Sequence, residues 1–289
     1  DEFSLFGENL DEWGLPGPIP PVRRVHVAVD GLRQLSGLAW GDAPPELVLL
    51  HGGAQNAHTF DTVALALQRP LLALDLPGHG HSDTGPHGPS AIESHAADVA
   101  VALGALTGAP LPLVGMSLGG LTALIVAAAH PELVSALVLI DITPGVTPEK
   151  ARRVVDFING PATFEDFDAI LDRTKAHNPT RSESSLRRGI LHNAVQRDDG
   201  SWVWRHQRDP APSVQAPPVG DLWARLEAMP QPVTLVRALG DGSMVDDADV
   251  AELMRRRPDA RVANVAGSGH SVQGDAPLAL AEILRRELD

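Results

Sequence analysis

Residues 111–124, LPLVGMSLGGLTAL, constrain the fold more than any other part of the sequence. An apolar, strand-like run leads into Ser117, and an alanine-rich helix is predicted to begin directly after it. A turn this tight requires a strained backbone at Ser117, which only small neighbours such as Gly115 and Gly119 leave room for. The helix also directs its first free N–H groups toward the serine. The pattern predicts a nucleophile elbow that exposes Ser117 for attack; an ordinary glycine-rich turn is the alternative.

Composition bounds the kind of protein that carries this turn. The 289 residues are 43% hydrophobic, which is enough to bury a large core as one α/β domain or as one domain with an insertion. Neither disorder nor a membrane span is indicated. The net charge of −14 argues against a nucleic-acid partner, because phosphate binding needs a basic face. The absence of cysteine excludes disulfides, thiolate metal sites and a cysteine nucleophile.

The first 21 residues are acidic and then rich in proline and glycine, which predicts an irregular lead-in with at most one short helix. They show neither the basic region nor the apolar region of a signal peptide. We therefore expect a cytoplasmic protein.

Strand-like and helix-like runs alternate along most of the chain. Strands are predicted at 22–29, 32–40, 46–50, 70–75, 111–116, 137–141, 232–238 and 261–265. Helices are predicted at 58–67, 91–106, 118–130, 247–257 and 277–288. This alternation favours a mostly parallel sheet covered by helices on both faces, and Asp30-Gly31 predicts that it begins with an antiparallel hairpin.

The alternation stops between 143 and 229. Three helix-like segments at 148–158, 164–176 and 184–196 follow one another without a strong strand between them. Residues 198–204 predict a turn and a short extended piece, and 211–218 return the chain to the strand-helix pattern. We expect a helical insertion that lies over the sheet.

Four motifs in this order resemble the α/β-hydrolase fold family, of the serine esterase, lactonase and C–C hydrolase type. They are His-Gly-Gly at 51–53, DLPGHGHS at 75–82, the elbow at 115–119, and Gly-Ser-Gly-His at 267–270. The resemblance implies an eight-stranded, mostly parallel sheet whose second strand is antiparallel. It also implies a helical cap inserted after the sixth strand.

These implications divide the chain into parts. Residues 1–21 form the irregular lead-in, 22–143 and 230–289 the α/β-hydrolase core domain, and 144–229 the helical cap. Oligomeric state is left open, because apolar cap helices can face either a substrate or a second subunit.

The resemblance places the catalytic base after the last strand, where His270 lies between glycine and serine. Neutral imidazole can take the serine proton and return it to the leaving group. Among the other histidines, His51, His79 and His81 lie in motifs that the family uses for loop structure. Whether the remaining candidates His58, His192 and His206 face a pocket is left open.

The triad acid has two candidates. Asp241 follows the seventh strand, where most of the family carries the acid, but the usual glycine is Ala238 and the spacing differs. Asp141 ends the sixth strand, 24 residues beyond Ser117, where some esterases and lactonases of the family carry it. We favour Asp141, because a carboxylate at the end of a buried run needs a partner. The alternative is that Asp141 only caps the strand end.

An oxyanion hole and a pocket complete the predicted site. The backbone N–H groups of Leu118 and Gly53, with Ala54 as a neighbouring candidate, should stabilise a tetrahedral oxyanion. Aromatic residues of the cap are expected to form an apolar lid, or else to hold the cap's own small core. They are Phe157, Phe164, Phe167, Trp202 and Trp204.

The predicted function is hydrolysis of a carboxylic ester or lactone through an acyl-Ser117 intermediate. A C–C bond hydrolase or a perhydrolase uses the same triad, and a ligand sensor or a cofactor-free lyase is the alternative of another class. Haloalkane dehalogenases and epoxide hydrolases of this fold use an aspartate nucleophile, so Ser117 argues against both. We expect a small apolar ester or lactone as the partner, no membrane association, and neither a metal nor an organic cofactor.

Overall fold

The computed structural model describes residues 2–85, 91–208 and 222–288. The predicted return of the chain at 211–218 lies outside these residues. Within them, no helix is long and apolar enough to cross a membrane.

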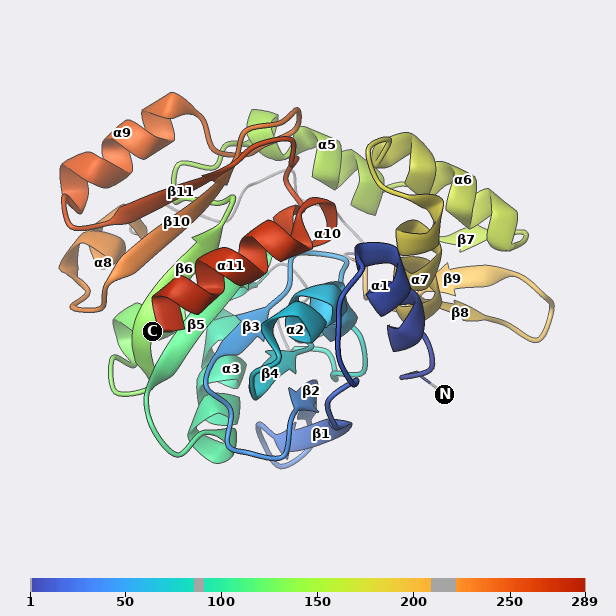
Figure 1. Ribbon diagram of the computed structural model, residues 1–289, viewed down its shortest axis with the longest axis horizontal. Helices are drawn as coiled ribbons and strands as arrows, with labels where there is room; N and C mark the ends of the chain where they lie inside the picture. The colour runs from blue at the N-terminus through green and yellow to red at the C-terminus, as the bar shows by residue number, and fades with distance from the viewer. Residues whose placement is uncertain (1, 86–90, 209–221, 289) are drawn as a thin grey trace.

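The core of the molecule is an eight-stranded sheet, in the spatial order β1-β2-β4-β3-β5-β6-β10-β11 (Figure 1). The second strand runs antiparallel to both of its neighbours, and the remaining pairs are parallel. The expected sheet, with its antiparallel beginning, is confirmed. The strands are β1 (Val22–Ala28), β2 (Gln34–Trp40), β3 (Val48–Leu50), β4 (Leu71–Leu74), β5 (Leu111–Met116), β6 (Val134–Ile140), β10 (Val233–Ala238) and β11 (Arg261–Val265).

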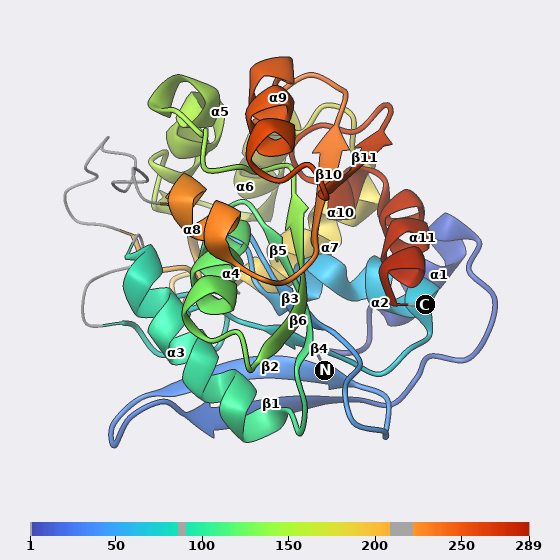
Figure 2. The same cartoon turned by 90° about the vertical axis from the view of Figure 1, so that its left-hand side faces the viewer.

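Helices cover both faces of the sheet, as the two views show (Figures 1 and 2). Apolar residues of α3 (Ile92–Leu106), α4 (Leu118–Ala129) and α9 (Asp247–Arg256) pack into one buried cluster with the sheet. Those of α1 (Phe6–Trp13), α2 (Asp61–Leu67) and α11 (Pro277–Leu288) pack into a second cluster on the other face. The short η1 (Ala57–Phe60) precedes α2, and α10 (Val272–Asp275) precedes α11.

The strand register brings the functional motifs to one edge of the sheet. Leu50 of β3 pairs with Gly115 of β5, and Met116 pairs with Ile140 of β6. Because these strands are parallel, the residues that follow them leave the sheet at the same end. The His-Gly-Gly segment, Ser117 and Asp141 therefore meet at the carboxyl edge, where ligands of open α/β sheets bind.

Helices and a small sheet lie between β6 and β10. The described helices are α5 (Pro148–Ile158), α6 (Phe167–His177), α7 (Glu183–Asn193) and α8 (Leu222–Ala228). A three-stranded antiparallel sheet lies beside α6 and α7, formed by β7 (Thr163–Phe164), β8 (Ala194–Gln196) and β9 (Trp202–Trp204). The division into core and cap stays a prediction.

The expected short extended piece at 198–204 contains β9, but the pairing of three strands into a small sheet was not expected. The predicted helix at 164–176 begins later because Asp166 is its N-cap and accepts a hydrogen bond from the N–H of Ala169. The predicted helix at 184–196 ends at Asn193, and the next three residues pair with β9 instead. Helix α8 was not predicted, and although it falls within the predicted cap range it packs against α4 of the core.

Candidate active site

Ser117 has the strained backbone that an elbow requires, with φ 52° and ψ −118°. Close packing of the glycines around it holds this geometry. A Cβ on Gly119 would lie 2.4 Å from the carbonyl oxygen of Leu50, and one on Gly115 would lie 2.3 Å from that of Gly119. The start of α4 therefore sits directly against β3 and β5. The side chain of Ser117 reaches the cavity described below.

Asp141 is fully buried, and its carboxylate accepts four hydrogen bonds. The N–H of Ala238 and the hydroxyl of Ser243 donate to Oδ1, at 3.0 and 2.7 Å. The N–H of Met244 donates to Oδ2 at 2.9 Å, and His270 Nδ1 lies 3.0 Å from the same oxygen. These donors provide the partners that a buried carboxylate requires.

His270 lies on the loop between β11 and α10 and lines the same cavity as Ser117. A carboxylate only accepts hydrogen bonds, so the contact with Asp141 fixes the ring proton on Nδ1. In the neutral ring Nε2 is then an acceptor, and it is buried without a hydrogen-bond partner among the described residues. Asp241, the alternative acid, is exposed, and no hydrogen bond joins it to His270 within the described part of the chain.

The His-Gly-Gly segment runs beside the elbow. A Cβ on Gly52 would lie 3.3 Å from Cβ of Ser117, and one on Gly53 would lie 3.9 Å from the side chain of Leu118. Ala54 adopts a positive φ of 58°. Gly53 and Ala54 line the cavity, so the backbone groups predicted for an oxyanion hole lie beside the serine.

The cavity has a volume of about 380 Å³ and lies between the carboxyl edge of the sheet and helices α5, α6 and α7. Of the five predicted lid aromatics, Phe157 and Trp204 line it. Phe164, Phe167 and Trp202 are not among its described lining residues, because they pack into a separate cluster with α6 and α7. The five aromatic residues thus divide between the cavity wall and a small apolar cluster of their own.

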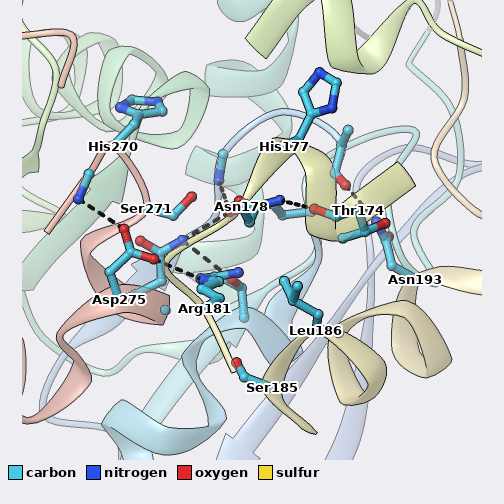
Figure 3. A pocket seen from close by; sticks show the side chains of 18 of the residues that line it. Thr174, His177, Asn178, Arg181, Ser185, Leu186, Asn193, His270, Ser271 and Asp275 are labelled. Atoms are coloured by element: carbon cyan, nitrogen blue, oxygen red, sulfur yellow. Dashed lines mark hydrogen bonds and ion pairs between the residues drawn. The ribbon is translucent and has the colours of Figure 1, made fainter. Parts of the chain in front are cut away.

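The cavity wall also carries polar contacts that sequence reasoning missed (Figure 3). Arg181, between α6 and α7, forms an ion pair with Asp275 of α10, with 3.0 Å between Nε and Oδ1. The other oxygen of Asp275 accepts a hydrogen bond from the N–H of Gly269, directly before His270. This chain of contacts ties the insertion to the loop that carries the imidazole. Its members are 94 residues apart, so no local sequence pattern identifies the pair.

Five of the other histidines divide between the core and the cavity wall. His51 and His79 are buried in the core, where burial lowers the pKa of each ring. His51 Nε2 accepts a hydrogen bond from the N–H of Leu76, which joins the loops after β3 and β4. His58 and His192 line the cavity, whereas His206 is not among its described lining residues and stacks on His79.

Comparison with known proteins agrees with the fold and the motifs. The model of the alpha/beta hydrolase family matches residues 47–283. Esterase Rv0045c of Mycobacterium tuberculosis is 44% identical, over 100% of this chain and 96% of its own. A solved structure of that esterase, from work on its transition metal inhibition, has a TM-score of 0.89 at 43% identity, and covers 100% of this chain and 99% of that one. The sn-1-specific diacylglycerol lipase ABHD11 of Mus musculus is 30% identical, over 82% of this chain and 79% of its own.

The match to the esterase spans the whole sheet, and the family model includes the segments that carry Ser117, Asp141 and His270. The chain therefore belongs to the alpha/beta hydrolase family.

Proposed function

We propose that the protein is a serine hydrolase that cleaves carboxylic esters, with Ser117 as nucleophile, His270 as general base and Asp141 as the triad acid. The hydrogen bond between His270 Nδ1 and the buried Asp141 carboxylate carries the proposal. It holds the imidazole in the tautomer whose Nε2 can accept the serine proton. The match to an esterase over the full chain supports the same reaction class.

The reaction begins when Ser117 Oγ attacks the ester carbonyl carbon and its proton passes to His270 Nε2. The C=O bond opens to a tetrahedral oxyanion, and the buried carboxylate of Asp141 stabilises the imidazolium. Collapse of the intermediate expels the alcohol, which takes the proton from Nε2. Water then attacks acyl-Ser117 with His270 again as base, releases the acid and restores the serine.

The N–H groups of Leu118 and Gly53 are proposed to bind the oxyanion, with Ala54 as the neighbouring candidate. The helix that begins at Leu118 directs its first N–H groups toward the reacting carbonyl. Loss of one such donor costs about 2.7–4 kcal/mol in measured cases. This contribution is specific to the transition state, because charge develops on the oxygen only then.

The substrate is proposed to be a small ester or lactone with an apolar acyl part. A lactone follows the same steps, but its leaving alcohol stays attached to the acyl group. Phe157, Trp204, Val154 and Ile158 supply apolar surface on the side of the cavity formed by the insertion. The cavity volume of about 380 Å³ is within the range of small-molecule sites.

The test combines a chromogenic ester with a covalent probe. Wild-type enzyme should release a burst of p-nitrophenol from a p-nitrophenyl ester, and a fluorophosphonate should label the peptide that contains Ser117. Ser117→Ala should lower kcat by about 10⁶-fold while the thermal midpoint changes little, since the hydroxyl fills no core space. Ser185→Ala, which removes another serine of the cavity wall, is the matched control and should stay active. An alanine variant of Ser117 with more than a few per cent of wild-type turnover would exclude Ser117 as the nucleophile.

A further inference from the structure

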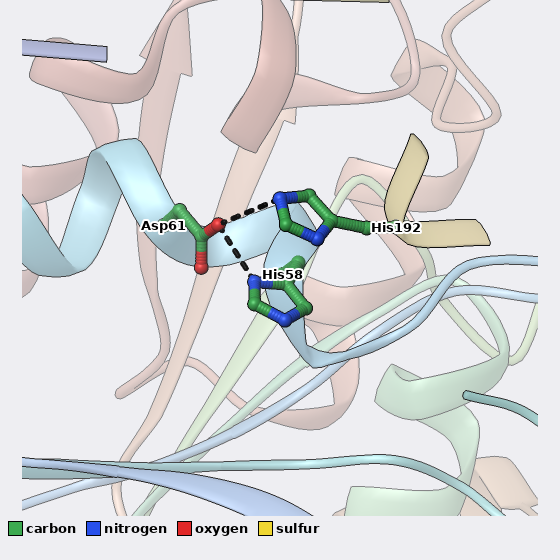
Figure 4. A group of neighbouring side chains, drawn as sticks. All are labelled: His58, Asp61 and His192. Atoms are coloured by element: carbon green, nitrogen blue, oxygen red, sulfur yellow. Dashed lines mark hydrogen bonds and ion pairs between the residues drawn. The ribbon is translucent and has the colours of Figure 1, made fainter. Parts of the chain in front are cut away.

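Three side chains of the cavity wall that the hydrolytic reaction does not use form a compact group (Figure 4). They are His58 of η1, Asp61 of α2 and His192 of α7. His58 Nδ1 lies 2.8 Å from Asp61 Oδ2, and His192 Nε2 lies 3.8 Å from the same oxygen. The two imidazole rings stack with 3.7 Å between centroids and 7° between planes.

Two atoms of the group are buried without a hydrogen-bond partner among the described residues. They are Asp61 Oδ1 and His192 Nε2. Asp61 is 4% exposed, so its unpaired oxygen is costly unless a ligand satisfies it.

We propose that His58, Asp61 and His192 form a binding site for one divalent transition metal ion, such as Zn²⁺. The site goes beyond the proposed hydrolysis and does not depend on it. Two imidazoles and one carboxylate are a ligand set that zinc and other late transition metals accept, whereas Ca²⁺ and Mg²⁺ prefer oxygen ligands. The cavity side remains open for a water molecule or a ligand group as the fourth donor.

The spacing of the donor atoms fits this ligand set. Zinc binds nitrogen and carboxylate oxygen at about 2.0–2.2 Å, so neighbouring ligand atoms of a tetrahedral site lie about 3.3 Å apart. The two observed separations from Asp61 Oδ2, 2.8 and 3.8 Å, lie on either side of this value. All three ligand atoms lie within 4.8 Å of one another, so small side-chain rotations are enough to bring them around one ion.

The surrounding charges are already compensated. Arg24, whose guanidinium lies 3.5 Å from His58 Nε2, forms ion pairs with Glu2 and Asp75. Arg188, on α7 near Asp61, is paired with Glu12. The cations nearest to the group therefore have carboxylate partners of their own, which limits their repulsion of a metal ion.

An ion at this site would link the insertion to the core. His192 comes from α7, whereas the other two ligands follow β3 at the carboxyl edge. The backbone of His192 already accepts a hydrogen bond from Asn56, and Asn193 donates one to the carbonyl of Ala54. The metal would therefore fix α7 relative to the loop proposed to bind the oxyanion. We expect bound Zn²⁺ to raise the thermal midpoint of the protein.

Isothermal titration of the full chain without a histidine tag, with ZnCl₂ as the probe, tests the site. One Zn²⁺ should bind per chain, and His192→Gln should weaken binding by at least about 100-fold, the upper end of what loss of an outer-shell partner costs. The exposed His130, which pairs with Glu132, supplies the control His130→Gln, which should bind like wild type. Neither CaCl₂ nor MgCl₂ should give a signal.

Cobalt reports the ligands directly. Co²⁺ bound to this nitrogen and oxygen set should give visible absorption bands that disappear in Asp61→Asn and in His192→Gln. His58→Gln replaces Asp61→Asn if the latter does not fold, as judged by circular dichroism. His270→Ala should still bind the metal, because its ring belongs to a different cluster of contacts. The proposal is overturned if folded His192→Gln binds Zn²⁺ like wild type, or if only His270→Ala abolishes binding.

Discussion

Asp141→Asn is the sharpest perturbation of the proposed triad, because the amide keeps the shape of the carboxylate and changes only its charge and hydrogen bonding. Each carboxylate oxygen accepts two hydrogen bonds, so the amide nitrogen must face two donors in either orientation. One backbone N–H then remains unpaired in the buried site, which costs about 1–3 kcal/mol of stability. The consequence for catalysis depends on which oxygen the nitrogen replaces.

If the nitrogen replaces Oδ2, it donates to His270 Nδ1 and moves the ring proton to Nε2, which can then no longer take the serine proton. The same error lowers kcat by about 10⁴-fold in a serine protease triad. If the amide nitrogen replaces Oδ1 instead, the hydroxyl of Ser243 can rotate to accept its hydrogen bond, and the ring proton of His270 stays on Nδ1. Loss of the charge-assisted bond to the imidazolium, worth about 1.5–3 kcal/mol, still lowers kcat by about 10–150-fold. Across both orientations we expect a fall in kcat of at least about 10-fold.

The assay compares kcat and KM for a p-nitrophenyl ester between wild type, Asp141→Asn and Asp241→Asn. Circular dichroism and thermal unfolding establish the folded fraction first, because the unpaired N–H also lowers stability. Asp241→Asn should keep near-normal rates, since the residue is exposed. If Asp241→Asn instead lost several orders of magnitude while Asp141→Asn stayed within tenfold of wild type, the triad acid would be Asp241.

Two further substitutions test the packing of the site. Gly119→Ala should lower the free energy of unfolding by at least about 1–3 kcal/mol in urea titration, because its Cβ would meet the carbonyl of Leu50. Gly104→Ala, in open space on α3, is the control and should instead raise the free energy of unfolding by about 0.5–1 kcal/mol. Equal effects of the two variants would refute the packing argument. Phe157→Ala should raise KM for apolar esters with little loss of stability. Phe164→Ala should instead lower the free energy of unfolding by about 3–5 kcal/mol. If neither variant changed KM for any ester, the apolar lid would be excluded.

The long elements and the sheet edge were predictable because their signals are local. Apolar runs gave every strand of the large sheet, and adjacency of β5 and β6 is enough to bring Asp141 near the elbow. The strands β7–β9 have only two or three residues each, so their pairing depends on contacts made after folding. Periodicity likewise does not say which aromatic side chains of α5 and β9 face the cavity. Arg181 and Asp275 meet only because two distant loops pack together.

Backbone strain identifies the same site without reference to any motif. Among the described residues, the non-glycine residues with positive φ are Ala54, Gln68, Ser117 and Asp141. Gln68 has an ordinary role as the left-handed C-cap of α2. The other three lie in segments that leave the carboxyl edge of three adjacent strands, β3, β5 and β6. Such conformations cost about 1–3 kcal/mol each and persist only where the surroundings enforce them. The tight glycine contacts at the elbow and the four hydrogen bonds to Asp141 are those surroundings. The strained, less stable conformations therefore occur where the proposed chemistry needs fixed geometry.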